Sequence, residues 1–237
     1  RESSMKKINL LLLLPGLWVL CAAGANGGTA AYWRFEEGPA GAYVDHGESA
    51  TGAYFPGALD SSGHNYHLSA WQEVDWSGEV YRTDVPFAYI PLTGAGNTFS
   101  LQNGGDVPGL WTQSEVLDAW TPEAWTVEAW VKCTSINNWR VAVGRDGDDI
   151  SGDNPAFRIM FTNANAVRAS FCDMSNTYHE LNTADQFVTA GRWYHLAAVS
   201  DGSTFILYVD GVERARKNLA TANTAMSNGS NGRIPAA

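Results

Sequence analysis

Five acidic and amide side chains lie within nine residues near the middle of the chain. The segment DGDDISGDN covers residues 146–154 and contains two glycines. Calcium takes roughly six to eight oxygen ligands, which closely spaced carboxylates and the carbonyls of a glycine-containing loop supply. The segment is not an EF-hand loop, because no glutamate stands at the twelfth position. We predict Asp146, Asp148 and Asp153 as calcium ligands, and the alternative is a solvated acidic turn.

A second oxygen-rich turn, DSSGHN, covers residues 60–65. Asp60 and Asn65 are a second candidate metal pair. The alternative is an Asx turn, in which the Asp60 carboxylate accepts hydrogen bonds from nearby backbone. His64 and His67 lie three positions apart, but the sequence identifies no third ligand for zinc.

Aromatic and amide side chains adjoin one another at two places. A sugar site needs an exposed ring that stacks on the sugar, beside polar groups that read its hydroxyls. Asn138 with Trp139, and Tyr178 with His179, have this composition. We predict these four residues as ligand-binding, and for Trp139 and Tyr178 the alternative is packing in the core.

The carboxylates do not show a catalytic pattern. A retaining glycosidase needs two carboxyl groups about 5 Å apart. Glu36 and Glu37 are adjacent and point to opposite faces of an extended chain, and Glu128 is alone in its predicted strand. No G-x-S-x-G nucleophile motif occurs. We therefore expect no catalytic residues and no enzyme activity.

The elements that hold these residues are short strands separated by turns. The run WTVEAWV alternates two sets of side chains from residue 125, and Asp-Gly turns flank the β-rich run TFILYVD. Residues 69–96 are expected to be loop with short strands, because their periodicity is poor. The tryptophans inside predicted strands are expected in the core; these are Trp33, Trp125, Trp130 and Trp193. Strands are predicted at 31–35, 98–102, 125–133, 139–145, 156–162, 166–172, 192–199 and 204–210.

The runs TVEAWVK and GRWYHLAAVSDG, followed by LYVDGV, resemble the laminin-G-like jelly-roll domains of the concanavalin A-like lectin/glucanase superfamily. YWRFEEG at 32–38 and DSSGHN at 60–65 resemble two earlier pieces of that family. The resemblance covers roughly residues 32–214. It implies an all-β, two-sheet antiparallel jelly-roll sandwich over residues 31–219. It implies no single function, because this fold hosts lectins, glycosidases, adhesion modules and spacers.

The two ends of the chain differ from the domain between them. Lys6-Lys7, the apolar run 8–23 and Ala23-Gly24-Ala25 are typical of a signal peptide, here residues 1–25 with leading non-native residues before Met5. The alternative is a retained membrane anchor. Residues 220–237 lack the last strand usual in the resembled family, so we expect a disordered or truncated end.

The charge of the chain limits its partners. The net charge is −10, and removal of residues 1–25 leaves about −12. Nucleic acids and anionic membranes are bound through clusters of Lys and Arg, so we expect no nucleic acid and no membrane insertion after signal cleavage. Cys133 and Cys172 form either a disulfide, which export permits, or two buried free thiols.

These features together predict an exported recognition module, secreted or held at the cell surface or in the periplasm. It would bind a glycan or a cell-surface component without catalysis, with calcium as a candidate cofactor. One alternative is a structural or adhesive spacer in a larger surface protein. Another is a glycoside hydrolase with an unfamiliar site.

Overall fold

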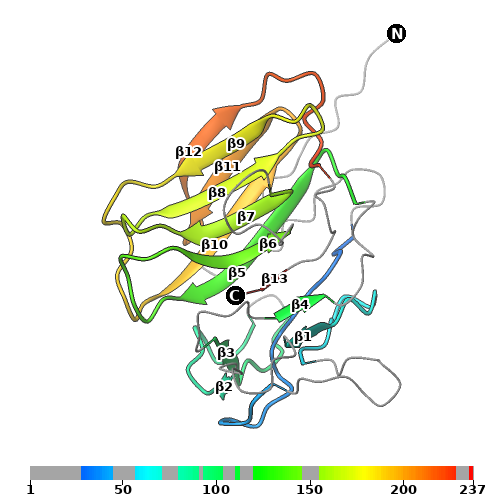
Figure 1. Ribbon diagram of the computed structural model, residues 1–237. Coiled ribbons are helices and arrows are strands. Elements are labelled where there is room, and N and C mark those ends of the chain that lie inside the picture. Colours follow the sequence, from blue (N-terminus) through cyan, green and yellow to red (C-terminus); the bar gives the residue numbers. More distant parts are fainter. Residues whose placement is uncertain are drawn as a thin grey trace.

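The computed structural model describes residues 28–44, 57–70, 80–90, 93–103, 110–112, 120–145, 155–227 and 235–236. Within these ranges the chain consists of strands, turns and loops and contains no helix (Figure 1). The described residues accordingly include no helix able to cross a membrane. The prediction of an all-β chain is confirmed for them.

Eight strands of five to eight residues form most of the two sheets. They are β5 (Trp125–Lys132), β6 (Arg140–Arg145), β7 (Phe157–Phe161), β8 (Val167–Cys172), β9 (Tyr178–Asn182), β10 (Trp193–Ser200), β11 (Thr204–Val209) and β12 (Val212–Asn218). Five shorter strands are β1 (Leu68–Ala70), β2 (Val80–Arg82), β3 (Ser100–Gln102), β4 (Leu110–Thr112) and β13 (Pro235–Ala236).

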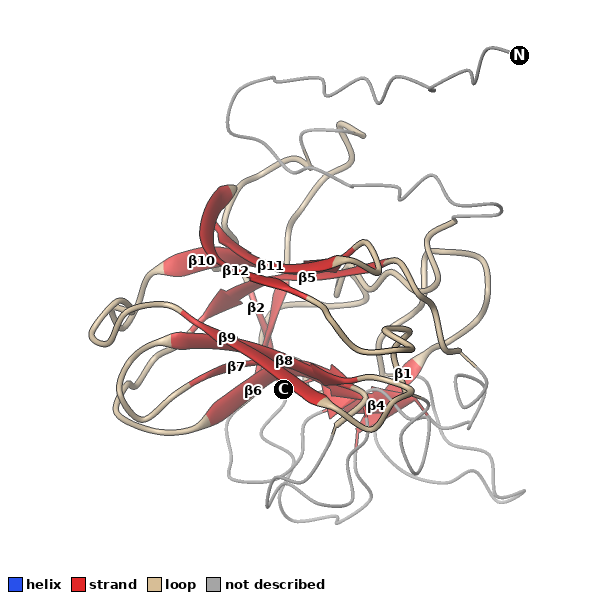
Figure 2. Ribbon diagram, turned by 90° about the horizontal axis from the view of Figure 1, so that it is seen from above, coloured by secondary structure: helices blue, strands red, loops and turns tan. Residues whose placement is uncertain are grey.

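Two antiparallel sheets face each other as layers (Figure 2). The smaller sheet has the order β12-β11-β10-β5, and the larger has the order β1-β4-β13-β6-β7-β8-β9. A separate hairpin pairs β2 with β3. The predicted two-sheet sandwich is therefore confirmed, and β10 is an inner strand of its sheet.

The hairpin of β10 and β11 shows why these residues form strands. Buried Phe205, Leu207 and Val209 alternate with partly exposed neighbours, as a strand with one face on a core requires. The turn before β11 contains Gly202 with a φ of 84°, a left-handed conformation that glycine adopts without a Cβ clash. The local pattern and the turn chemistry thus specify the same hairpin.

The core between the sheets is rich in aromatic rings. Trp125 from β5 contacts Phe171 from β8 edge-on, with ring centroids 5.2 Å apart. Phe171 also contacts Phe205 from β11 at 4.9 Å. All three rings are almost fully buried, so they join the two layers directly.

Trp130 and Trp193 lie on the outer face of the smaller sheet and not in this core. The expectation that both are core residues was wrong, because the alternate positions face the core: Tyr194 on β10, and Ala129 and Val131 on β5. Trp130 packs edge-on against Phe87 at 5.1 Å. Trp193 donates a hydrogen bond of 3.0 Å from Nε1 to Asp84 and lies beneath Lys132. Asp84 and Phe87 therefore cover part of this outer face.

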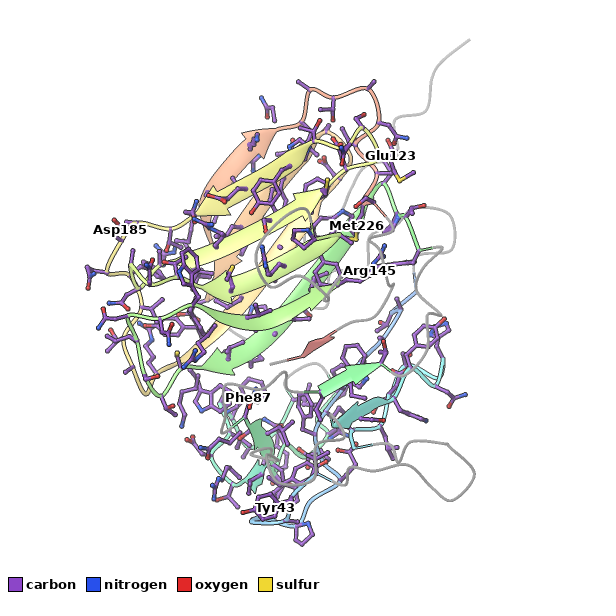
Figure 3. All side chains as sticks on the ribbon, viewed as in Figure 1. Tyr43, Phe87, Glu123, Arg145, Asp185 and Met226 are labelled. Carbon is purple, nitrogen blue, oxygen red and sulfur yellow. The ribbon has the colours of Figure 1, made fainter. Side chains whose placement is uncertain are left out.

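Residues 220–227 belong to the segment expected to be a disordered or truncated end. Met226 is fully buried and forms a β-bridge with Asp173. Arg145, also fully buried, lies beside Met226 and donates a hydrogen bond of 2.6 Å to the carbonyl of Ser227 (Figure 3). Farther on, Ala236 of β13 pairs with β4 and β6. Among the described residues, the long last strand of the resembled family does not occur.

Cys133 and Cys172 are both buried, and no disulfide joins them. Cys133 Sγ donates to the carbonyl of Ser135 at 2.5 Å, and Cys172 Sγ lies 3.8 Å from Asn176 Oδ1. Of the two interpretations left open by the sequence, the disulfide between Cys133 and Cys172 is not formed in this structure. Burial raises the pKa of Cys133 and outweighs the opposing effects of the Ser135 carbonyl and Arg140.

Candidate functional site

The outer face of β6–β9 carries an aromatic ring beside a set of charged and amide groups. Trp139 lies directly before β6 and is 42% exposed, although it is a large hydrophobic residue. The guanidinium of Arg168, on β8, lies 5.1 Å from the centre of its ring. A guanidinium over an indole face is a favourable cation–π contact, which holds both side chains in place.

Arg168 is also the centre of a hydrogen-bond network that reaches β9. Its Nη1 lies 3.1 Å from Glu180 Oε2, and its Nε donates to Asn182 Oδ1 at 2.9 Å. Asn182 Nδ2 in turn donates to Glu180 Oε1 at 2.7 Å, and the Tyr178 hydroxyl donates to Glu180 Oε2 at 3.2 Å. A chain of contacts therefore connects Trp139 to Tyr178.

The register of β8 and β9 explains this network. Arg168 lies opposite Asn182, and Ser170 lies opposite Glu180. Because successive side chains of a strand point to opposite faces, Tyr178, Glu180 and Asn182 share the outer face. The intervening His179 and Leu181 are buried against the core.

Two of the four predicted ligand-binding residues, Trp139 and Tyr178, therefore lie on one surface. Asn138 is exposed, and its Oδ1 accepts a hydrogen bond of 2.9 Å from the backbone of Trp139, so it orients the start of β6. His179 does not reach this surface, because it is 2% exposed and stacks on Phe171 with a centroid distance of 4.8 Å.

His179 instead belongs to a buried polar cluster at the base of the β8–β9 turn. Its Nε2 lies 2.8 Å from Asp173 Oδ2, and the hydroxyl of Thr221 donates to the same oxygen. Asp173 Oδ1 accepts from the backbone of Ser175 and Thr177 at 2.9 and 2.8 Å. Burial raises the pKa of Asp173, but these hydrogen bonds outweigh it and hold the pKa below its usual value.

Asp60 caps the turn that it begins. Its carboxylate accepts hydrogen bonds from the backbone of Tyr32 at 2.9 Å, of Ser62 at 2.8 Å and of Tyr66 at 3.0 Å. Burial raises the pKa of Asp60, and these bonds outweigh it and lower the pKa below its usual value. Asn65 follows with a φ of 63° in the left-handed region. The geometry is that of an Asx turn, and metal binding by Asp60 and Asn65 stays a prediction.

The other predicted calcium ligands, Asp146, Asp148 and Asp153, lie outside the described residues. In the described ranges, no group of three or more His, Cys, Asp or Glu side chains is arranged to hold a metal ion. Calcium binding by this chain therefore also stays a prediction.

The carboxylates considered for catalysis have separate structural partners. Glu36 accepts hydrogen bonds from the backbone of Thr98, at 2.8 Å, and of Phe99. Glu37 accepts from the backbone of Leu59 at 2.9 Å. Glu128 lies 3.4 Å from Nε2 of His195 on the outer face of the smaller sheet.

Three residues of the β6–β9 surface were not predicted from the sequence. Glu180 and Asn182 follow Tyr178 at intervals of two, so the alternation in YHELN was a usable signal. Arg168 gave no comparable signal, because its contact with Glu180 depends on how β8 and β9 are paired.

Comparison with solved structures finds proteins of similar fold. The binding domain of Paraclostridial Mosquitocidal Protein 1 superposes with a TM-score of 0.50 at 13% identity, over 75% of this chain and 41% of that one. The receptor-binding domain of botulinum neurotoxin type G gives 0.47 at 11%, over 76% and 40%. The CBM40 of Ruminococcus gnavus IT-sialidase gives 0.41 at 17%, over 49% and 64%. This chain therefore matches less than two thirds of the length of each.

Comparison with curated protein sequences finds no match. The sequence model of the concanavalin A-like lectin/glucanases superfamily, in its laminin G form, matches residues 103–235. This range contains β5–β12, and hence both facing layers of the sandwich and the whole β6–β9 surface. The chain belongs to the concanavalin A-like lectin/glucanases superfamily.

Proposed function

We propose that this chain is a non-catalytic module that binds a glycan through the outer face of β6–β9. One observation carries the proposal: the exposed ring of Trp139 lies next to donors and acceptors that are already held in place. A sugar ring has an apolar face that stacks on an indole and hydroxyls around its edge that both donate and accept. The surface offers a partner for each.

The network around Glu180 is suited to reading hydroxyls. Arg168 supplies N–H donors, and Glu180 Oε1, which accepts one hydrogen bond from Asn182, can accept a further one. Because Asn182 and Tyr178 also bond Glu180, these groups lose little conformational freedom when a ligand arrives. Both oxygens of Glu180 already accept hydrogen bonds, which fits a role in recognition and not in proton transfer.

Further parts of the proposal rest on the sequence. Lys6-Lys7, the apolar run 8–23 and Ala23-Gly24-Ala25 support export to the cell surface, the periplasm or the medium. The ligand would then be a glycan or another cell-surface component, and calcium bound by the 146–154 segment would assist. N-terminal sequencing of the exported protein should start near Asn26; a cytoplasmic product starting at Met5 would contradict export.

Glycan-array binding followed by calorimetry tests the function. We expect the wild-type protein to bind a subset of glycans and Trp139→Ala to weaken that binding at least tenfold, about 1.4 kcal/mol. Tyr89→Ala is the matched control, because Tyr89 is 68% exposed and pairs with Gly96, outside β6–β9. If the protein binds no glycan on the array, the result would favour the structural or adhesive spacer. Turnover of a polysaccharide would favour the hydrolase.

A further inference from the structure

A row of polar side chains crosses the middle of the same face. Arg158 of β7 pairs with Ser170 of β8, and Ser170 pairs with Glu180 of β9. Directly opposed residues of neighbouring strands share a face, so these three side chains lie next to one another. On the far side of Arg158 the row ends at Gly144 of β6, which has no side chain. Arg158 and Ser170 have no part in the network around Arg168.

Two atoms of this row lack hydrogen-bond partners. Ser170 is 1% exposed, and its Oγ is enclosed without a partner. The Nε of Arg158 is likewise enclosed, and no hydrogen bond to it is found in the part of the chain that the structure describes. An enclosed donor without an acceptor raises the free energy of the unliganded protein, and this cost is larger when the donor is charged.

The local charge favours an anion as the missing partner. Glu180 is the carboxylate nearest along the row, but it is already paired with Arg168 at 3.1 Å. Arg158 itself forms no ion pair with a carboxylate among the described residues. A guanidinium binds carboxylate or sulfate oxygens through paired N–H groups, and a serine hydroxyl can donate to the same group.

We propose that Arg158 and Ser170 bind the carboxylate or sulfate group of an acidic sugar. The inference rests on the proposed function and specifies its ligand class. Arg158 lies two positions along β7 from Met160, and Met160 pairs with Arg168 of β8. Arg168 is the residue whose guanidinium lies over the ring of Trp139. The two rows are thus roughly 7 Å apart, about the length of one sugar residue.

Nuclear magnetic resonance of the arginine Nε–Hε groups tests this proposal with simple probes. The probes are glucuronate, glucose 6-sulfate and glucose, and the Arg158 signal is assigned by its loss in Arg158→Gln. We expect one or both acids to shift this signal saturably and glucose to leave it unchanged. Ser170→Ala should weaken the response several-fold. Arg216→Gln is the matched control, because Arg216 is paired with Glu213 on β12 at 2.7 Å.

The response to each acid identifies the anion. A shift of the Arg158 signal with glucuronate alone indicates a carboxylate site, and a shift with glucose 6-sulfate alone indicates a sulfate site. No shift with either acid, or an equal shift with glucose, overturns the inference. If array glycans still bind through Trp139 in that case, the proposed function stands and only the acidic preference fails. If Arg158 responds but Trp139→Ala leaves array binding unchanged, the anion site stands and the proposed glycan binding through Trp139 fails.

Discussion

A single buried carboxylate, Asp173, connects three parts of the chain. It binds His179 of β9, Thr221 of the terminal segment and the backbone of its own turn. Its pKa is held below the usual value, so folding favours the ionised form. The stability that it contributes is fully present above the unfolded pKa of about 4, and is lost as the pH falls through the lower, folded pKa.

Asp173→Asn should therefore destabilise the protein at neutral pH by about 2–3 kcal/mol, because an amide nitrogen cannot accept the bonds made by Oδ2. Below about pH 4 the difference from wild type should narrow as the wild-type carboxylate is protonated. Urea unfolding at several pH values measures both effects. A difference that is constant from pH 7 to pH 3 would show that the charge of Asp173 does not matter.

At the scale of elements, β10 shows how one strand separates core from surface. Tyr194 and Leu196 are 1% and 0% exposed between the sheets. Trp193 and His195 point the other way, toward Asp84 and Glu128. Large side chains thus cover both faces of an inner strand, and their sizes alone do not distinguish the two faces.

A pair of substitutions in β10 should give unequal losses. Leu196→Ala should cost about 3 kcal/mol, because it leaves a cavity between the sheets. Trp193→Ala should cost only about 1 kcal/mol, since that ring lies half-buried on the outer face. Chemical denaturation of both variants measures the difference. An equal or larger loss for Trp193 would place it in the core after all.

At the scale of the molecule, the larger sheet and the terminal segment depend on each other. Arg145 ends β6 and donates hydrogen bonds to the carbonyls of Trp120 and Ser227, at 2.5 and 2.6 Å. Met226, beside it, is fully buried. The segment 220–227 is therefore held by the sandwich core, and the β6–β9 surface is built on strands that this segment helps to anchor.

Calcium should act on the molecule as a whole if the 146–154 segment binds it. Repulsion among Asp146, Asp148 and Asp153 would destabilise the metal-free protein, and a cation that binds only the folded state raises the melting temperature with its concentration. Magnesium should do so poorly, because it requires a tight octahedral site. Asp148→Asn should remove most of the shift. No thermal shift and no heat of binding at millimolar calcium would leave these residues a solvated turn.

Most of the long strands and their turns could be predicted from sequence because their signals are local, although β9 and β12 were not predicted and residues 31–35 form no strand. The alternation in TFILYVD and the flanking Asp-Gly turns depend on neighbours within a few residues, and β11 spans Thr204–Val209 as the pattern indicates. The prediction of Trp139 and Tyr178 as ligand-binding residues was local in the same way, since ring type and adjoining amides are read from the chain itself.

Only the tertiary structure decided which face of a strand meets the core and which residues meet across strands. Trp193 and Leu196 are both large and apolar, and the opposing sheet determines which one is enclosed. His179 and Glu180 are adjacent, but one is buried on Phe171 and the other bonds Arg168. The pairing of Arg168, Ser170 and Arg158 with their neighbours depends on register, and a slip of one residue would turn each side chain to the other face.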